Sequence, residues 1–296
     1  MKKCMIVAGI LVVAGLLLML IGGVTTIGRE DSYDTILSRV FYTVDAYGSP
    51  TTRTETFPAD TSRIEIGTVS DDIIVAVGDV DVITVIVTEN YDGEYKMSRR
   101  GDTLNVEWNA PKRRFWFLRF EFWSASRLFQ RGTHPVEVIV PRGYEGRHLK
   151  LETVSGDLNI SDIGVTGDLN TNTVSGQITL SGATTGGGAH LGTVSGDVRW
   201  TGGACRQLRY EGVSGSLRTD GVDFTDAKLD SVSGDIQLLR VTGPESDWYV
   251  RHTTISGSLS FNGKHLGGGK PYTYGSSSAP RRIEANTVSG RLVVEE

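Results

Sequence analysis

The pentapeptide TVSGD at residues 153–157 returns, with small changes, throughout the second half of the chain. Later copies read TVSGQ, TVSGD, GVSGS, SVSGD, TISGS and TVSGR, and successive serines are 20, 20, 19, 19, 23 and 33 residues apart. A near-constant period of this size predicts a stacked repeat architecture. The repeated serine and glycine positions are Ser155, Gly156, Ser175, Gly176, Ser195, Gly196, Ser214, Gly215, Ser233, Gly234, Ser256, Gly257, Ser289 and Gly290.

The residues on both sides of each motif alternate between apolar and polar, which is typical of half-buried strands. The apolar residue three positions after each serine is Leu158, Ile178, Val198, Leu217, Ile236, Leu259 or Leu292. The valine of the motif is out of phase with the alternation before it, which indicates a corner in the backbone. We attribute the glycine at this corner to its dihedral freedom. Each repeat is therefore predicted to form a strand, a corner, a second strand and a turn.

A single coil of this kind cannot bury its own apolar row, but stacking on neighbouring coils can, at roughly 1.5–3 kcal/mol for each large apolar side chain. We therefore predict an all-β fold, a single-stranded parallel β-solenoid (β-helix) with about 20 residues per coil, preceded by one N-terminal transmembrane helix. Seven equivalent serines are expected to be structural, with hydroxyls that bond adjacent coils. A nucleophile would instead need one unique set of partners.

The iterated T-V-S-G-D-[ILV] pattern, closed by YGSSSAPRRIEANTVSGRLVVEE at residues 274–296, resembles the bacterial "putative-adhesin" domain of unknown function. The resemblance covers about residues 60–296. It implies a β-solenoid that is often tethered to the membrane and encoded beside envelope-stress systems of the Lia and phage-shock type. The family has no accepted catalytic residues, so the resemblance assigns none to this chain.

Composition excludes several classes of protein. A formal charge of −5 argues against a nucleic-acid partner. The two cysteines, Cys4 and Cys205, provide no disulfide framework. Cys4 stands too early to be a lipobox cysteine, and Cys205 is expected to be a small buried residue.

The N-terminus predicts a membrane anchor. No charged residue occurs from Cys4 to Ile27, and this run is long enough to cross a bilayer as a helix. Lys2 and Lys3 should remain in the cytoplasm, which places the solenoid outside the cell membrane as the extracytoplasmic part of a single-pass, N-in protein. A cleaved signal peptide, with Gly22 and Gly23 near the cleavage site, is the alternative.

The chain is predicted to divide into five parts. These are a cytoplasmic stub (1–4), a transmembrane anchor or uncleaved signal (5–27), a linker with the first strand (28–58), irregular opening β coils (59–146) and regular solenoid repeats (147–296).

A dense cluster of aromatic and basic residues, PKRRFWFLRFEFWSASRLFQRG, occupies residues 111–132 within the opening coils. Its periodicity fits neither a strand nor a helix. It could cap the open end of the solenoid, lie at the membrane surface or dock a protein partner. The candidate membrane or partner contacts are Arg113, Arg114, Phe115, Trp116, Phe117, Arg119, Phe120, Phe122 and Trp123.

Familiar catalytic and metal-binding patterns are missing from the sequence. The five histidines do not pair at ligand spacing with each other or with a cysteine. The aspartates that follow the repeated glycine are interrupted by Gln177, Ser216, Ser258 and Arg291. The GGGK sequence at residues 267–270 lacks the Ser or Thr of a P-loop. We therefore predict no metal, no cofactor and no catalytic residues.

Two functions remain. The first is a non-catalytic, membrane-anchored surface module that binds cell-envelope components, either a protein or a glycan, or an envelope-stress signalling partner. The second is a β-helix polysaccharide lyase or hydrolase, which would need carboxylates or basic residues gathered along one face. The outward positions of the repeats are a mixed polar set without such a concentration, which favours the binding module.

Overall fold

The computed structural model describes residues 51–89, 94–109, 135–268 and 271–296. The chain divides into two units, residues 1–49 and 50–296, and every described residue belongs to the second. The predicted anchor (5–27), most of the linker and the segment 111–132 lie outside the described residues. Among the residues that are described, no helix is long and apolar enough to cross a membrane.

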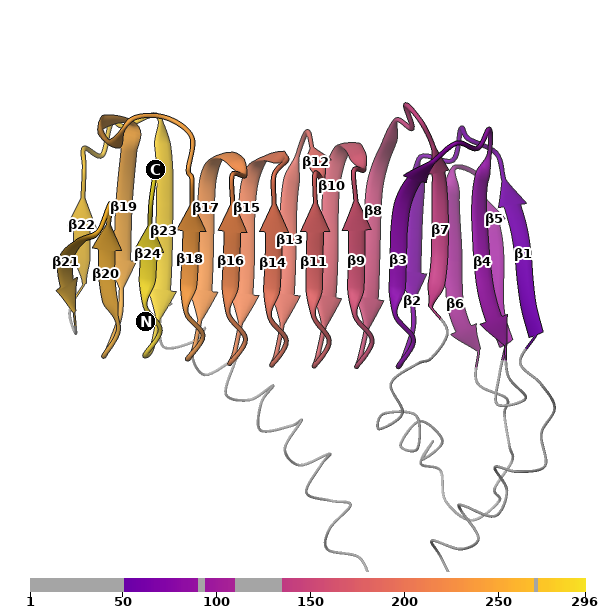
Figure 1. Cartoon of the computed structure of the whole chain (residues 1–296), viewed down its shortest axis with the longest axis horizontal. Helices are drawn as coiled ribbons and strands as arrows, with labels where there is room; N and C mark the ends of the chain where they lie inside the picture. Colours follow the sequence, from indigo (N-terminus) through magenta and orange to yellow (C-terminus); the bar gives the residue numbers. More distant parts are fainter. Residues whose placement is uncertain (1–50, 90–93, 110–134, 269–270) are drawn as a thin grey trace, which may run out of the picture. The chain divides into compact units, whose positions relative to one another are not determined.

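The central coils each contribute to both of two facing sheets, as Figure 1 shows, and in one coil β12 and β13 share the place of a single strand. Parallel pairing at a constant offset joins each coil to the next: Leu151, Thr171, Leu191, Tyr210 and Leu229 follow one another across one sheet. The prediction of an all-β, solenoid-like fold is confirmed. The strands of these coils are β8 (Gly146–Thr153), β9 (Leu158–Ser161), β10 (Gly164–Thr173), β11 (Ile178–Ser181), β12 (Thr184–Thr185), β13 (Gly188–Thr193), β14 (Val198–Thr201), β15 (Ala204–Gly212), β16 (Leu217–Asp220), β17 (Asp223–Ser231) and β18 (Ile236–Leu239).

The core lies between the two sheets and is filled by the alternate residues of every strand. In β9, for example, Leu158 and Ile160 are buried, whereas the alternate residues Asn159 and Ser161 are partly exposed. The largest buried side chains include Trp200 and Tyr210 from neighbouring coils. Because each coil packs against the next, the apolar row that one coil cannot bury alone becomes a continuous core.

At the C-terminal end, the order of coils in space differs from their order in the sequence. The last coil, β23 (Arg281–Thr287) and β24 (Leu292–Val294), lies between β17–β18 and the coil formed by β19 (Trp248–Thr253) and β20 (Ser258–Phe261). The chain thus runs outward to β19 and β20, then returns to fill the gap. This excursion accounts for the long steps of 23 and 33 residues between the last serines.

Antiparallel strands close this end. β21 (Lys264–Gly268) pairs with β20, and β22 (Tyr272–Tyr274) pairs with β19. A 3₁₀ turn, η2 (Glu245–Asp247), leads into β19. Phe261 and Tyr274 stack with ring centroids 4.9 Å apart, so aromatic rings cover the end of the core.

The N-terminal end is a mixture of parallel coils and antiparallel strands. β2 (Arg63–Gly67) and β3 (Ile73–Gly78) stack on β8 and β9, and β6 (Thr103–Asn109) and β7 (Val136–Pro141) stack outside them. β1 (Thr51–Phe57) and β4 (Ile83–Glu89) continue one sheet antiparallel, and β5 (Glu94–Arg100) continues the other. Four of the seven opening strands, β2, β3, β6 and β7, therefore form two parallel coils like the regular repeats. The other three, β1, β4 and β5, pair antiparallel and end the two sheets.

The edge strand β1 carries charged residues on its inner face. Arg53 lies 3.3 Å from Glu89 and also donates to the backbone carbonyl of Tyr95. Inward-pointing charges on an edge strand discourage further pairing. This sheet consequently ends at β1.

The segment around residues 111–132 occupies the position of a corner. Across the corners of two coils, Ile73 comes seven positions after Ile66, and Leu158 comes seven positions after Leu151. The equivalent residues of the next coil, Val106 and Val136, are 30 residues apart. The chain therefore has 30 − 7 = 23 additional residues at this corner.

Candidate functional site

The repeated serine and glycine residues line up at one edge of the solenoid, where every coil turns from one sheet into the other. The glycines are buried and pack on one another: a methyl group built on Gly196 would overlap the backbone carbonyl oxygen of Gly176. None of the seven glycines of the repeat has a positive φ. Close approach between coils, rather than the dihedral freedom we expected from the sequence, is what requires glycine here.

A buried hydroxyl that the sequence analysis did not single out holds each corner. Thr193 Oγ1 accepts a hydrogen bond from the backbone N–H of Gly196 at 2.9 Å, and Thr173 does the same for Gly176 at 3.0 Å. Equivalent bonds occur at Thr153, Ser231 and Thr254. In the coil where Gly212 takes this place, the Tyr210 hydroxyl donates to the carbonyl of Gly215 at 2.6 Å. A recurrent Thr or Ser two residues before the serine was the signal that could have revealed this role.

The repeated serines are more exposed than these threonines and point along the stack. Ser195 donates from its backbone N–H to the Val174 carbonyl at 2.9 Å and from its hydroxyl to the same oxygen at 3.2 Å. Ser155, Ser175, Ser214, Ser233 and Ser256 make the same pair of contacts, and Ser289 makes the backbone bond. The six hydroxyls are thus directed at backbone carbonyls of the neighbouring coil, which suits a structural role.

The aspartates after the glycines also bond between coils. Asp157 accepts the backbone N–H of Gln177 at 2.8 Å, and Asp197 accepts that of Ser216 at 3.0 Å. Asp235 accepts the N–H of Arg291 at 2.9 Å, and hydrogen bonding to Arg291 lowers the pKa of this carboxyl. Asp157, Asp197 and Asp235 stand in every second coil, roughly 10 Å apart, whereas Asp72 lies in the coil next to Asp157 and accepts its backbone N–H at 2.7 Å. Within the described ranges, no three His, Cys, Asp or Glu residues are grouped as metal ligands.

A row of partly exposed aliphatic residues runs along the same edge. We call it the valine ridge. Neighbouring residues of the ridge are connected by the serine-to-valine hydrogen bonds. At its C-terminal end Ile255 is 72% exposed. In spatial order the ridge consists of Val69, Val154, Val174, Val194, Val213, Val232, Val288 and Ile255.

Two side chains that could in principle be reactive, Cys205 and His252, are buried in the core instead. Burial raises the pKa of the Cys205 thiol to about 12, so this cysteine is an inert core residue. His252 is buried, and its Nε2 lies 2.9 Å from Thr287 Oγ1. Desolvation lowers the pKa of His252 to about 4. Neither residue has the exposure that a nucleophile or a metal ligand needs.

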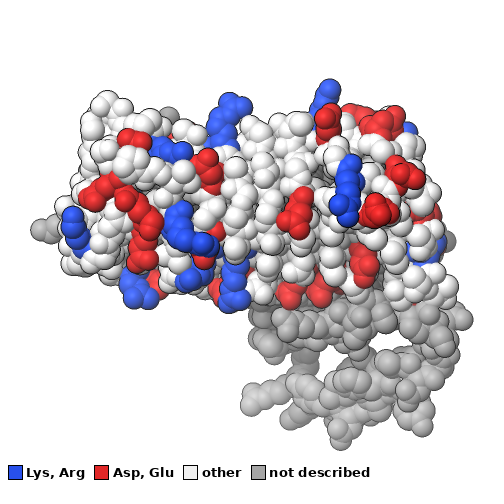
Figure 2. Space-filling model, turned by 45° about the horizontal axis from the view of Figure 1, so that its top comes forward, with Lys and Arg blue, Asp and Glu red and all other residues white. Residues whose placement is uncertain are grey.

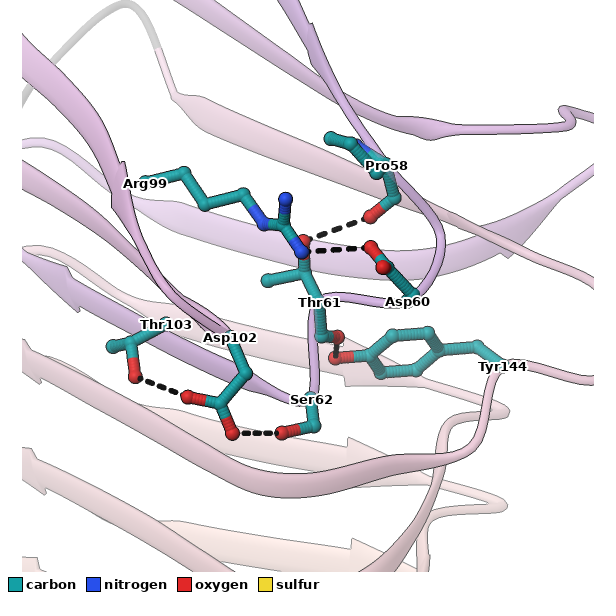
Figure 3. A network of polar contacts seen from close by, with 8 residues as sticks. All are labelled: Pro58, Asp60, Thr61, Ser62, Arg99, Asp102, Thr103 and Tyr144. Carbon is teal, nitrogen blue, oxygen red and sulfur yellow. Dashed lines mark hydrogen bonds and ion pairs between the residues drawn. The ribbon is translucent and has the colours of Figure 1, made fainter.

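A polar network at the N-terminal end connects three turns (Figure 3). The Tyr144 hydroxyl donates to the carbonyl of Thr61 at 2.8 Å, and Ser62 donates to Asp102 at 2.7 Å. The bond from Ser62 lowers the pKa of Asp102. Arg99 pairs with Asp60 at 2.7 Å. The network joins the β1–β2, β5–β6 and β7–β8 turns, and its members bond one another, so we assign it to stability.

The surface charges give no single-sign groove on the face that Figure 2 shows, where acidic and basic side chains are interspersed. Several of them pair across or along strands, for example Lys150 with Glu152 at 2.9 Å and Arg282 with Glu284 at 2.7 Å. The candidate contacts in residues 111–132 lie outside the described residues.

Comparisons with solved structures return chains of low similarity. A "putative cell adhesion protein" from Clostridium sporogenes has 11% identity and a TM-score of 0.33, with 83% of this chain and 99% of that chain covered. A "putative lipid binding protein" from Parabacteroides distasonis has 14% identity and a TM-score of 0.48, with coverage of 84% and 94%. A "putative adhesin" from Parabacteroides merdae has 11% identity and a TM-score of 0.41, with coverage of 84% and 97%.

The search of curated proteins gives no significant match. A family model does match, over residues 61–295, and this range includes all the coils described above apart from the edge strand β1. The chain therefore belongs to the Toastrack DUF4097 family.

Proposed function

We propose that this protein is a non-catalytic, membrane-anchored β-solenoid module on the outer side of the cell membrane, where it binds a cell-envelope component or an envelope-stress signalling partner. One observation carries the non-catalytic part. The repeated polar groups of the corner edge, Thr, Ser and Asp, bond between or within coils. Catalysis needs a nucleophile or acid with an adjacent base and room for substrate, and these groups are committed to backbone partners.

The membrane anchor is supported by the uncharged run from Cys4 to Ile27 with Lys2 and Lys3 before it. Such an arrangement favours an N-in orientation with the solenoid outside. A rigid stack of coils is then held near the bilayer by a short linker, which suits the presentation of a long binding edge to other envelope molecules.

The alternative, a polysaccharide lyase or hydrolase, needs carboxylates within reach of one sugar. A glycosidase places its pair of carboxyl groups roughly 5–9.5 Å apart on either side of the bond. The corner aspartates Asp72, Asp157, Asp197 and Asp235 each accept instead a backbone N–H of the neighbouring coil. This arrangement supports the binding module over the enzyme.

The test is capture of ligands by the full-length tagged chain in native membranes, with in-cell crosslinking before detergent extraction and analysis of bound protein, lipid and glycan. We expect one enriched envelope component whose purified form binds the purified chain directly. The matched control carries Gly196→Val, which should disturb the stack and abolish the binding. Shortened glycan chains after incubation with acidic polysaccharides would contradict the proposal and favour the enzyme.

A further inference from the structure

The valine ridge is an apolar surface that the regular fold leaves partly uncovered. Its valines are half-buried, although the Thr, Ser or Gly directly before each of them is buried. Adjacent coils are about 4.8 Å apart, so the seven steps of the ridge span roughly 34 Å. An apolar row of this length on a soluble face marks an interaction surface more often than an isolated exposed valine does.

Carboxylates flank the ridge on both sides. The residues directly before the corner include Glu152, Glu211 and Asp230, and those directly after the glycine include Asp197 and Asp235. Glu211 pairs with Arg209 at 2.5 Å, Glu152 with Lys150 at 2.9 Å and Asp197 with Arg199 at 4.0 Å, and the side chains of Glu152 and Asp197 are nevertheless 48% and 49% exposed. A partner that combines apolar and cationic groups therefore fits this edge.

This chain contains such a partner, and it begins and ends at the ridge. β6 ends at Asn109 and β7 begins at Val136, and these strands stack on β2 and β3, whose corner contains Val69. The 25 residues 110–134 between them are outside the described residues. Because a chain extends at most ~3.3–3.6 Å per residue, a connection of this length can reach out and back over about 40 Å.

The charges are complementary. Residues 111–132 contain six basic residues and one acid, a formal charge of +5, and seven aromatics. The whole chain has a charge of −5, so the remainder has −5 − 5 = −10. Because the segment and the ridge belong to one chain, their effective concentration is in the mM range, and a separate partner would have to compete with it.

We propose that the valine ridge is a docking surface for residues 111–132 of the same chain, with aromatic side chains on the valines and arginines beside the flanking carboxylates. The inference goes beyond the proposed function and does not depend on it. It makes the corner edge a covered surface and assigns the aromatic, basic segment to the solenoid rather than to lipid.

The test is site-directed crosslinking in the full chain with Cys4→Ser, held in a micelle of neutral detergent. One cysteine replaces Phe120 in the segment and the other replaces Val174 on the ridge, and a short bismaleimide reagent connects them. The matched control places the second cysteine at Ser181, an exposed residue at the opposite end of the strand that follows Val174. We expect the Val174 pair to crosslink within one chain at least tenfold faster than the Ser181 pair.

The charge dependence gives a second measurement on the same variants. Glu152→Gln combined with Asp197→Asn should lower the crosslinking rate severalfold, and so should added salt. Equal rates for the two cysteine pairs would overturn the proposal. Crosslinks between two chains would overturn it in favour of a second copy. So would loss of the Val174 crosslink when anionic lipid is added, which would assign the segment to the membrane surface. Val194→Cys serves as a replacement if the Val174 variant does not keep the melting temperature of the unchanged chain.

Discussion

Gly196 shows how a single residue fixes the distance between coils. Its Cα packs against the carbonyl of Gly176, and Gly215 packs in the same way against Gly196. At this column of glycines, each coil therefore packs directly against the previous one. A side chain at one of these positions must push two coils apart or tilt them, and the pairing of strands on both sides of the corner weakens together.

We predict that Gly196→Ala destabilises the protein by about 1–3 kcal/mol, the usual cost of overpacking, and that Gly196→Val costs more. The matched control is Gly164→Ala, because a methyl group there meets nothing within 4 Å and Gly164 has no positive φ. Denaturant unfolding of the full chain measures the difference. A Gly196→Val variant that melts at the temperature of the unchanged chain would show that the corner is not closely packed.

Thr193 and Ser195 in one corner should contribute unequally. Thr193→Val keeps the shape but leaves the buried N–H of Gly196 without its acceptor, which we expect to cost about 1–3 kcal/mol. Ser195→Ala removes only a second donor to the Val174 carbonyl, because the backbone N–H already bonds that oxygen. Its effect should stay within about 0.5 kcal/mol. Equal losses of unfolding free energy in the two variants would contradict this division of roles.

His252 should make the outer C-terminal coil sensitive to acid. Its pKa is lowered from 6.5 to about 4 by burial, so the folded protein keeps it neutral where the unfolded chain already binds a proton. Stability therefore falls as the pH drops from about 6.5 to about 4, by up to about 3 kcal/mol for 2.5 pKa units, and no further below that range. His252→Gln should remove this component, so unfolding free energies of both proteins measured from pH 4 to 7 isolate it. If the unfolding free energies of the two proteins changed equally with pH, His252 would not be the source of the acid sensitivity.

At the scale of elements, the sequence was sufficient for the strands and corners but not for the order of the coils. Alternation around Ser175 predicts strands on both sides of a corner, and β10 and β11 lie there. The insertion of β23–β24 between β17–β18 and β19–β20 was not predictable from the repeats, because every coil offers nearly the same edge to a neighbour. Connection lengths decide between such arrangements, and a long connection such as residues 262–280 permits both.

The antiparallel pairing of the strands at the ends of the stack could not be predicted from the sequence for a similar reason. Val85 and Ile86 in β4 belong to a β-branched run that suits either direction of pairing. The direction in which β4 pairs with β1 and β7 appears only in the folded structure. The site was less predictable than the fold, because the buried Thr column and the valine ridge acquire their roles through contacts between coils, which the spacing of one repeat does not reveal.

Paired cysteines can test the coil order. In the valine ridge Val288 lies between Val232 and Ile255, although Ile255 comes before Val288 in the sequence. We predict that Val232→Cys with Val288→Cys, and Val288→Cys with Ile255→Cys, oxidise readily, since adjacent strands are about 4.8 Å apart. Val232→Cys with Ile255→Cys spans two coils, roughly 10 Å, and should not form a disulfide. Cys4→Ser is the background, and gel mobility under non-reducing conditions is the readout. A disulfide between residues 232 and 255, with none between 232 and 288, would show that the coils follow their order in the sequence.

At the scale of the whole molecule, the two ends of the stack determine how the protein can be used. Antiparallel edge strands close both ends, β1 and β5 at one and β21 and β22 at the other, which disfavours continuation of the parallel stack by a separate copy. Binding of a partner then has to use the long faces of the stack. The described part of the chain enters this stack through β1.

The orientation of the tether gives the last prediction. We expect an N-in protein whose solenoid lies outside the cytoplasmic membrane, because Lys2 and Lys3 precede the uncharged run and should stay inside. Protease added to intact protoplasts should therefore remove an epitope fused after Glu296 while a fragment with the N-terminal segment remains in the membrane. Because strands in a closed stack resist cleavage, a protease site inserted at residue 50, just before β1, ensures that an outside solenoid is released. Detergent-permeabilised protoplasts are the control. An epitope protected in intact protoplasts and lost only after permeabilisation would place the solenoid in the cytoplasm.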